Sequence, residues 1–190
     1  MTVERDTAVE EQNVLSLDVG GGSFQLTDAN GQCFKGAHGS TTATAEMCGV
    51  QGRQFTNETS PNPCTMEQCS VLRERLRGNI STPAWVRKSI LQNDAVVIAL
   101  GGDTAAFRMA FMATGASNPY TLAQVVNAIQ SLVGKSDEAI EGEGYPQARM
   151  LLPKLILVCA ILEAAEVDAV HYVQTNGSCL GVIAEQSLWR

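Results

Sequence analysis

The sequence predicts an α/β domain built on a mixed β-sheet, and three observations support this fold class. Apolar runs at residues 14–19, 95–100 and 167–173 have the length of strands. Segments with the spacing of helices separate these runs. Two further short extended segments, joined by turn residues, follow the first run and indicate an antiparallel meander. We therefore expect three parallel strands, a meander extending one edge, and helices on both faces of the sheet.

The composition is that of a globular protein. The 190 residues are 45% hydrophobic and 17% charged, which suits one domain with a sizeable core. Residues 1–13 are polar and acid-rich and are predicted to be a flexible tail or linker, so the domain is expected to span residues 14–190. The formal net charge of −7 argues against broad binding to nucleic acid, which needs a basic surface.

The cysteines and the apolar segments favour a cytoplasmic protein with no membrane partner. None of the six cysteines forms a C-x-x-C pair and there are only two histidines, so we expect reduced thiols rather than a zinc site. The first residues lack the cationic and apolar segments of a signal peptide. The longest apolar run, 150–162, is too short to span a bilayer.

The domain is predicted to begin with a strand–turn–strand unit. Strands are expected at 14–19 and 24–27, and three glycines lie between them. Asn-Gly at positions 30 and 31 is a strong hairpin signal and leads to a third strand at 32–36. Residues 37–64 are rich in Gly, Ser, Thr, Asn and Pro and show weak periodicity, so no regular element is predicted there.

Two helices are predicted next. Thr65 and Gln68 match a capping box, which opens a helix whose arginines, Arg73 among them, are expected to be solvated. Thr82 is the predicted N-cap of a second, shorter helix, with Pro83 at its first position.

The rest of the chain is predicted to alternate strands and helices. The expected elements are a strand at 95–100, helices at 105–112 and 121–132, a loop at 134–144, a helix at 147–166, a strand at 167–173 and a helix at 180–187. The strand at 95–100 shows no alternation and is expected to be buried. The helix at 147–166 is apolar nearly all round and should be central, with Pro153 kinking it or ending its first segment.

The strongest functional signal is the turn after the first strand, Gly20, Gly21, Gly22 and Ser23. Glycines tolerate the positive φ of a sharp turn and leave backbone N–H groups open to an oxyanion. Ser23 adds a hydroxyl donor. Asp18, at the end of the strand, has the carboxylate to hold a divalent cation or to orient a water. A hairpin turn with a bulge would show the same three glycines, so a phosphate loop and a structural turn are both open.

A second candidate turn follows the apolar run at 95–100. It contains Gly101, Gly102 and Thr104, and a helix is predicted to begin immediately after it. A strand, two glycines and a helix N-terminus form a place where a phosphate or nucleotide can approach the backbone. A tight strand-to-helix connection has the same pattern. We expect the two turns to face one cleft.

The segment Asp-Val-Gly-Gly-Gly-Ser, residues 18–23, resembles the second phosphate loop of the actin-like ATPases, whose fold is ribonuclease H-like. With the second glycine turn and the helix that carries Arg149 and Pro153, it is most similar to the exopolyphosphatase/guanosine-pentaphosphate phosphatase (Ppx/GppA) family. The resemblance is to the second, C-terminal domain of that family and covers about residues 14–187.

The resemblance implies a Mg²⁺-assisted phosphoanhydride hydrolase. Asp18 would be the catalytic and metal-binding carboxylate, and the two glycine turns with Thr104 would hold terminal phosphates of polyphosphate or guanosine pentaphosphate. In the family, catalysis takes place between two domains, and the first domain supplies the general base. We expect no such domain within these 190 residues, so a separate first domain or a homodimer would complete the site. Alone, the chain is expected to be weakly active or inactive.

Three departures from the family pattern count against catalysis. Gln25 stands where the family has Glu, Asp103 stands where it has Thr, and Cys179-Leu180 stands where it has Arg-Glu. Each change removes a charge or hydroxyl that polyphosphate chemistry could use. Two alternatives therefore stay open: a catalytically degenerate domain that binds phosphate, nucleotide or a protein partner, and an ATP-binding fragment from another actin-like branch.

Overall fold

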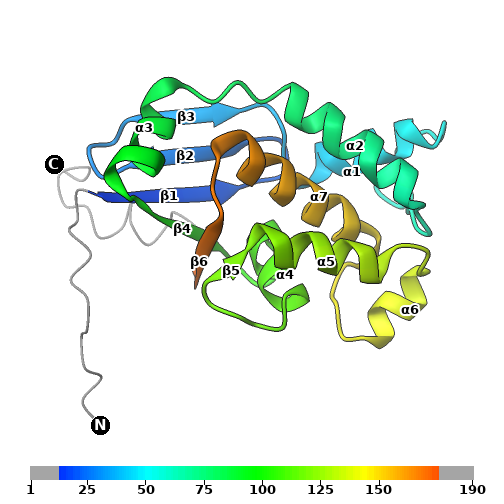
Figure 1. Ribbon diagram of the computed structural model, residues 1–190. Coiled ribbons are helices and arrows are strands. Elements are labelled where there is room, and N and C mark those ends of the chain that lie inside the picture. The colour runs from blue at the N-terminus through cyan, green and yellow to red at the C-terminus, as the bar shows by residue number, and fades with distance from the viewer. Residues whose placement is uncertain (1–12, 176–190) are drawn as a thin grey trace, which may run out of the picture.

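Six strands form one mixed sheet in the order β3-β2-β1-β4-β6-β5 (Figure 1). The computed structural model describes residues 13–175. The strands are β1 (Val14–Val19), β2 (Phe24–Asp28), β3 (Cys33–Gly36), β4 (Val96–Gly101), β5 (Tyr120–Thr121) and β6 (Ala169–Gln174). The helices are α1 (Ser40–Val50), α2 (Met66–Gly78), α3 (Ala84–Asn93), α4 (Ala106–Ala113), α5 (Leu122–Leu132), α6 (Asp137–Gly142) and α7 (Ala148–Ala165).

The sheet has the predicted strand directions. Strands β1, β4 and β6 run parallel, with Asp18 beside Leu100 at the carboxyl ends of β1 and β4. Strands β2 and β3 continue antiparallel from β1 and form the predicted meander. The short β5 pairs antiparallel with β6 at the other edge and was not predicted. The parallel register brings the turns that follow β1 and β4 to the same edge of the sheet.

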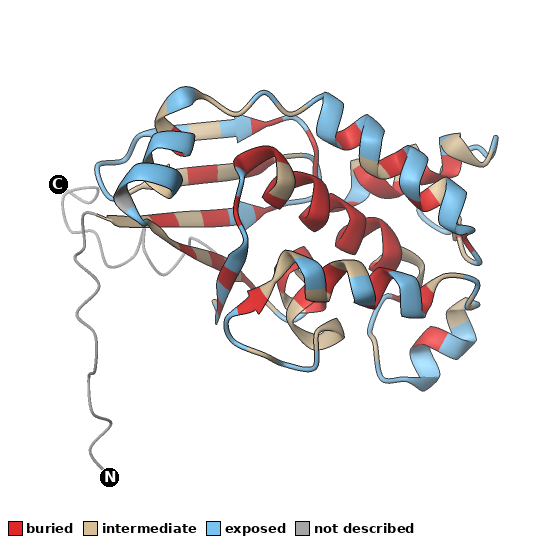
Figure 2. Ribbon diagram, in the orientation of Figure 1, coloured by how far each residue is buried: buried red, intermediate tan, exposed pale blue. Residues whose placement is uncertain are grey.

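One face of the sheet carries the core. Leu15 and Leu17 of β1, Val97 and Ala99 of β4 and Tyr172 of β6 are buried, and they pack in one cluster with the helices. Figure 2 shows the helices on this side of the sheet and beyond the carboxyl ends of its strands. Residues of β4 alternate between buried and half-buried, so the expectation that this strand is buried holds for one of its faces only. The outward positions of β6 are exposed. The helix expected at 180–187 lies outside the described residues, so helical cover of the second face stays a prediction.

Helix α7 is the centre of the helical layer, as predicted. Fifteen of its 18 residues are buried, and helices α1, α2, α4, α5 and α6 all contact it. The helix continues through Pro153 without a break, so the expectation that Pro153 ends a first segment is wrong. A helix buried on nearly every side needs an apolar surface all round, which explains its composition.

Two helices lie in segments that were predicted to be irregular. Helix α1 falls within 37–64, where small and β-branched residues such as Thr41 and Thr44 obscure the helical period. Helix α6 falls within the expected loop 134–144; it has six residues, and the Ser136 hydroxyl accepts a hydrogen bond from the Ala139 N–H at its start. Both helices pack on α7, so tertiary contacts decide their formation.

Two of the three helix starts that were predicted from capping residues are confirmed. The capping boxes of Thr65 with Gln68 and of Thr121 with Gln124 both form. Thr82, however, does not cap α3, whose N-cap is Pro83. The Thr82 hydroxyl instead donates to the Ala164 carbonyl at the end of α7, 2.7 Å away. Thr82 therefore connects two helices rather than starting one.

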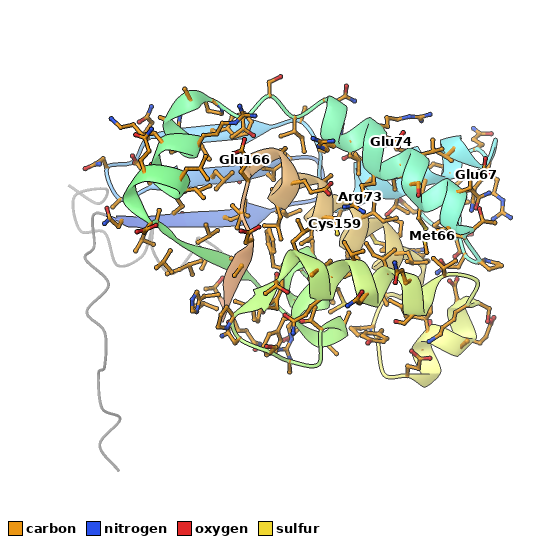
Figure 3. All side chains as sticks on the ribbon, viewed as in Figure 1. Met66, Glu67, Arg73, Glu74, Cys159 and Glu166 are labelled. Carbon is orange, nitrogen blue, oxygen red and sulfur yellow. The ribbon has the colours of Figure 1, made fainter. Side chains whose placement is uncertain are left out.

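The prediction that Arg73 is solvated is wrong. Arg73 pairs with Glu163 across the α2–α7 interface. Its Nε donates to Oε2 of Glu163 at 2.9 Å, and its Nη2 donates to Oε1. Figure 3 shows Arg73 pointing from α2 towards α7, close to Cys159. Glu163 raises the pKa of Arg73 through this bond, and the pair fixes α2 against the central helix.

The described residues contain five cysteines, all of them free thiols, four buried and Cys33 exposed. Cys179 lies outside the described residues. Between residues 13 and 175, no helix combines the length and hydrophobicity needed to cross a membrane.

Candidate functional site

The turns after β1 and β4 meet at one open groove of about 420 Å³. Gly20 and Gly21 line it from the first turn, and Gly102 and Thr104 line it from the second. The first turn of α1 and the first two turns of α7 complete the lining. Because β1 and β4 are parallel neighbours, both turns leave the sheet at the same edge. The predicted meeting of the two glycine turns is therefore what the structure shows.

The first glycine turn is held by the start of α1. The Gly20 N–H donates to the Ser23 carbonyl at 2.8 Å and closes the turn. The carbonyls of Gly20 and Gly21 accept from the N–H groups of Ser40 and Thr41, at 2.9 and 2.8 Å. These bonds satisfy the first amides of the helix, which otherwise have no intrahelical partner.

The turn's own amides are left open to a ligand. The N–H groups of Gly21, Gly22 and Ser23 donate to no other residue that the structure describes. None of the three glycines has a positive φ, contrary to expectation. A Cβ at Gly21 would lie only 3.3 Å from the Thr41 hydroxyl. The turn can therefore bring its backbone against an oxyanion.

The second turn is anchored below the groove by Gly101. This residue is buried, and its carbonyl accepts from the Tyr172 hydroxyl at 2.7 Å and from the Thr175 N–H at 3.0 Å. A Cβ at Gly101 would lie 2.4 Å from that of Ala105, so only glycine fits. Gly101 therefore supports the turn, while Gly102 and Thr104 reach the groove. Asp103 also lines the groove and accepts from the Gln174 amide at 2.7 Å.

Asp18 lies outside the lining of this groove. It is exposed, and its neighbours Leu17 and Val19 are buried against the helices. Since side chains alternate along a strand, the Asp18 carboxylate projects from the opposite face of the sheet. Gln25, its partner on β2, donates from Nε2 to the Ser23 hydroxyl at 3.1 Å. Asp18, Gln25 and the Ser23 hydroxyl thus belong to the far side of the turn.

The donor set does not form a resident metal site. No group of three or more His, Cys, Asp or Glu that could hold a metal ion exists among residues 13–175. Asp18 is a single exposed carboxylate, and Asp103 belongs to the other turn. Mg²⁺ often binds through one or two carboxylates with substrate phosphates and waters. These residues would therefore meet Mg²⁺ only together with a phosphate that carries it.

Lys154 of α7 is the groove residue that sequence reasoning missed. Its side chain is only 2% exposed, yet it lines the groove. Its Nζ donates to the Thr104 carbonyl and to Oε1 of Gln147, both at 2.7 Å. Burial lowers the pKa of Lys154 to about 8. A lone lysine inside a helix that is otherwise apolar on almost every side was the signal that could have identified it.

A smaller hollow of about 90 Å³ adjoins the groove. It shares Thr41 and Met150 with the groove and is lined further along by Arg149. The hollow and the groove therefore lie next to each other at the start of α7.

Solved structures of Ppx/GppA proteins have the fold of this chain. A Ppx/GppA family member from Aquifex aeolicus matches over 100% of this chain and 65% of its own, with a TM-score of 0.62 and 16% identity. An exopolyphosphatase-like protein matches over 90% and 59%, with a TM-score of 0.59 and 14% identity. An exopolyphosphatase from Cytophaga hutchinsonii matches over 87% and 54%, with a TM-score of 0.53 and 16% identity.

These matches confirm the predicted actin-like fold. At such low identity, they establish the fold and not the activity. The chain spans between 54% and 65% of the length of these three solved structures. The sequence itself matches no protein-family profile and no curated protein.

Proposed function

We propose that this chain is the phosphate-binding domain of an exopolyphosphatase-like phosphohydrolase. The groove would hold the terminal phosphoryl group of polyphosphate or of a guanosine pentaphosphate. The observation that carries this proposal is the meeting of two glycine turns at the carboxyl ends of adjacent parallel strands. Ligands of open α/β sheets bind at this edge.

The groove offers donors suited to a phosphoryl group. The Gly21 amide is free of partners in the described residues, and the hydroxyl-bearing residues Thr41 of α1 and Thr104 of the second turn both line the groove. Fixed neutral donors stabilise the negative charge that builds up on phosphoryl oxygens as water attacks and the anhydride oxygen leaves. Mg²⁺ arriving with the substrate would neutralise part of that charge. The hollow beside Arg149 would accommodate the next phosphate of the chain.

The attacking water needs a general base. Asp103 is the one carboxylate in the described lining of the groove, and it already accepts a hydrogen bond from Gln174. Asp18 projects from the other face of the sheet. The resemblance implies that the general base comes from a separate first domain or from a second copy of the chain.

A binding domain without hydrolytic activity is the second candidate. Gln25 favours it, because its amide bonds the Ser23 hydroxyl at the position where the family has a carboxylate. Such a domain would retain the phosphate groove and lack turnover. Binding of phosphate is thus common to both candidates, and turnover with a complementing first domain separates them.

The test is a titration with tripolyphosphate followed by backbone amide shifts. We expect the largest shifts at Gly20–Ser23 and Gly102–Thr104, and weak affinity because half of a two-domain cleft is absent from the experiment. Gly21→Ala should weaken binding at least about tenfold by crowding the groove, whereas Gly49→Ala, on open surface of α1, should not. Shifts confined to residues remote from both turns would reject the site. Tighter binding of ATP than of tripolyphosphate would favour an ATP-binding domain instead.

A further inference from the structure

Lys154 is a buried cation whose hydrogen-bond partners carry no negative charge. Its Nζ contacts a backbone carbonyl and an amide oxygen, and desolvation alone shifts its pKa, with no contribution from a neighbouring charge. Buried ammonium groups are normally paired with carboxylates, because an uncompensated charge in a low-dielectric site is costly. Within the described residues, no carboxylate hydrogen-bonds to the Lys154 ammonium.

Charged side chains on the helices around α7 are engaged elsewhere or lie outside the groove. Helix α5 carries no charged residue. Glu46 of α1 contacts His38, Arg73 of α2 pairs with Glu163, Arg108 of α4 lies over the Phe111 ring, and Asp137 of α6 accepts from Ser60. Asp103 is the one acidic residue in the described lining, and it is exposed and bonded to Gln174. Among residues 13–175, no carboxylate is bonded to Lys154, and the groove beside it has room for an anion.

We propose that Lys154 binds the phosphoryl group directly and that the ligand is its counter-ion. An ammonium has three donors, and the described residues accept from two of them, so one is available to a ligand oxygen. A charge-assisted bond to phosphate is stronger than the bonds to neutral oxygens that the side chain makes here. This role rests on the proposed phosphate-binding function, and it makes Lys154 the residue that selects an anion over a neutral ligand.

The surroundings of Lys154 do not require a lysine for stability alone. Its carbonyl partner belongs to Thr104, a residue of the exposed turn after β4 and not of the core. The residues around it on α7 are apolar, and a methionine of similar length would fill the same space. A lysine held there against the cost of burial points to a use for its charge.

The experiment compares tripolyphosphate affinity in the full chain by calorimetry. Lys154→Met should raise Kd about 10- to 100-fold, as expected for loss of one charge-assisted bond. Lys88→Met is the matched control, because Lys88 is exposed on α3 next to the amino end of β4. It removes the same charge and should leave Kd within about twofold.

A second variant distinguishes the effect of the Lys154 charge from the effect of its hydrogen bond to the Thr104 carbonyl. Lys154→Gln retains an N–H donor and removes the charge, so it should lose as much affinity as Lys154→Met. Wild-type affinity in either variant would overturn the role of Lys154 while leaving the phosphate groove in place. Failure of the wild-type chain itself to bind tripolyphosphate would overturn both the role of Lys154 and the proposed function.

Discussion

Gly39, the residue before helix α1, lies so close to Gly21 that no side chain fits between them. A Cβ at Gly39 would lie 2.4 Å from the carbonyl carbon of Gly21 and 2.5 Å from its oxygen. This approach allows the Ser40 N–H to donate to Gly20 and the Thr41 N–H to donate to Gly21. The glycine turn and the first turn of α1 therefore form one rigid unit beside the groove.

Replacing Gly39 with alanine should damage both stability and ligand binding. We expect Gly39→Ala to destabilise the protein by about 1–3 kcal/mol, because backbone must move to admit the methyl group. Tripolyphosphate affinity should fall as well, since the turn shifts. Gly49→Ala in the same helix has open space around it and should stabilise by up to about 1 kcal/mol. Urea unfolding measures both, and equal stability of the two variants would show that the contact is not tight.

The Arg73–Glu163 pair should contribute more to stability than the exposed pair of Arg87 with Glu166. Arg73 makes two bonds to a Glu163 side chain that is only 20% exposed. Arg73→Met keeps the apolar stem and leaves Glu163 unpaired, which should cost about 1–3 kcal/mol. Arg87→Met should cost less than about 1 kcal/mol, since the side chains of Arg87 and Glu166 are both well exposed. Equal losses in thermal unfolding would contradict this ranking.

Local signals explain the parts of the fold that the sequence predicts well. The capping boxes at Thr65 and Thr121 depend on residues three positions apart, and the strand β1 depends on an apolar run that ends at three glycines. Helices α1 and α6 depend on α7, which lies far along the chain, and no local period marks them. Arg73 is similar, because its partner Glu163 is 90 positions away.

In the candidate site, too, features set by neighbouring residues were predictable and features set by distant contacts were not. The two glycine turns were predictable, since each follows a recognisable strand. Asp18 was placed with them because it is adjacent in sequence, although the alternation of buried Leu17 and Val19 already puts its side chain on the opposite face. Lys154 contributes to the groove through the packing of α7 against the turn at Thr104, which no local pattern shows.

Lys154 should make stability rise with pH above about 8. Burial lowers the pKa of Lys154 from 10.5 to about 8, so between these values the unfolded chain binds more protons than the folded one. The free energy of unfolding therefore increases with pH across this window, by on the order of 3 kcal/mol for this group. Lys154→Met should lack this rise and should be more stable than the wild type below pH 8.

The measurement is urea unfolding from pH 7 to 10.5 in phosphate-free buffer. The difference between wild type and Lys154→Met isolates Lys154 from the other groups that titrate in this range. Lys88→Met should follow the wild-type curve, because Lys88 is exposed. Parallel curves for the wild type and Lys154→Met would mean that the lysine is not desolvated in solution.

The 190-residue chain alone should hydrolyse polyphosphate poorly or not at all. Asp18 projects away from the groove, Asp103 is bonded to Gln174, and Gln25 beside Asp18 offers no carboxylate. A missing general base typically costs about 10²–10⁴ in rate, and each lost stabilising donor costs about 10²–10³, although such losses need not multiply. The assay is phosphate release from tripolyphosphate with Mg²⁺, comparing the wild type with Asp18→Asn and with Asp94→Asn, an exposed carboxylate at the end of α3. A substantial wild-type rate that collapses in Asp18→Asn alone would show that these residues form a complete enzyme, and the proposal of a half-site would be wrong.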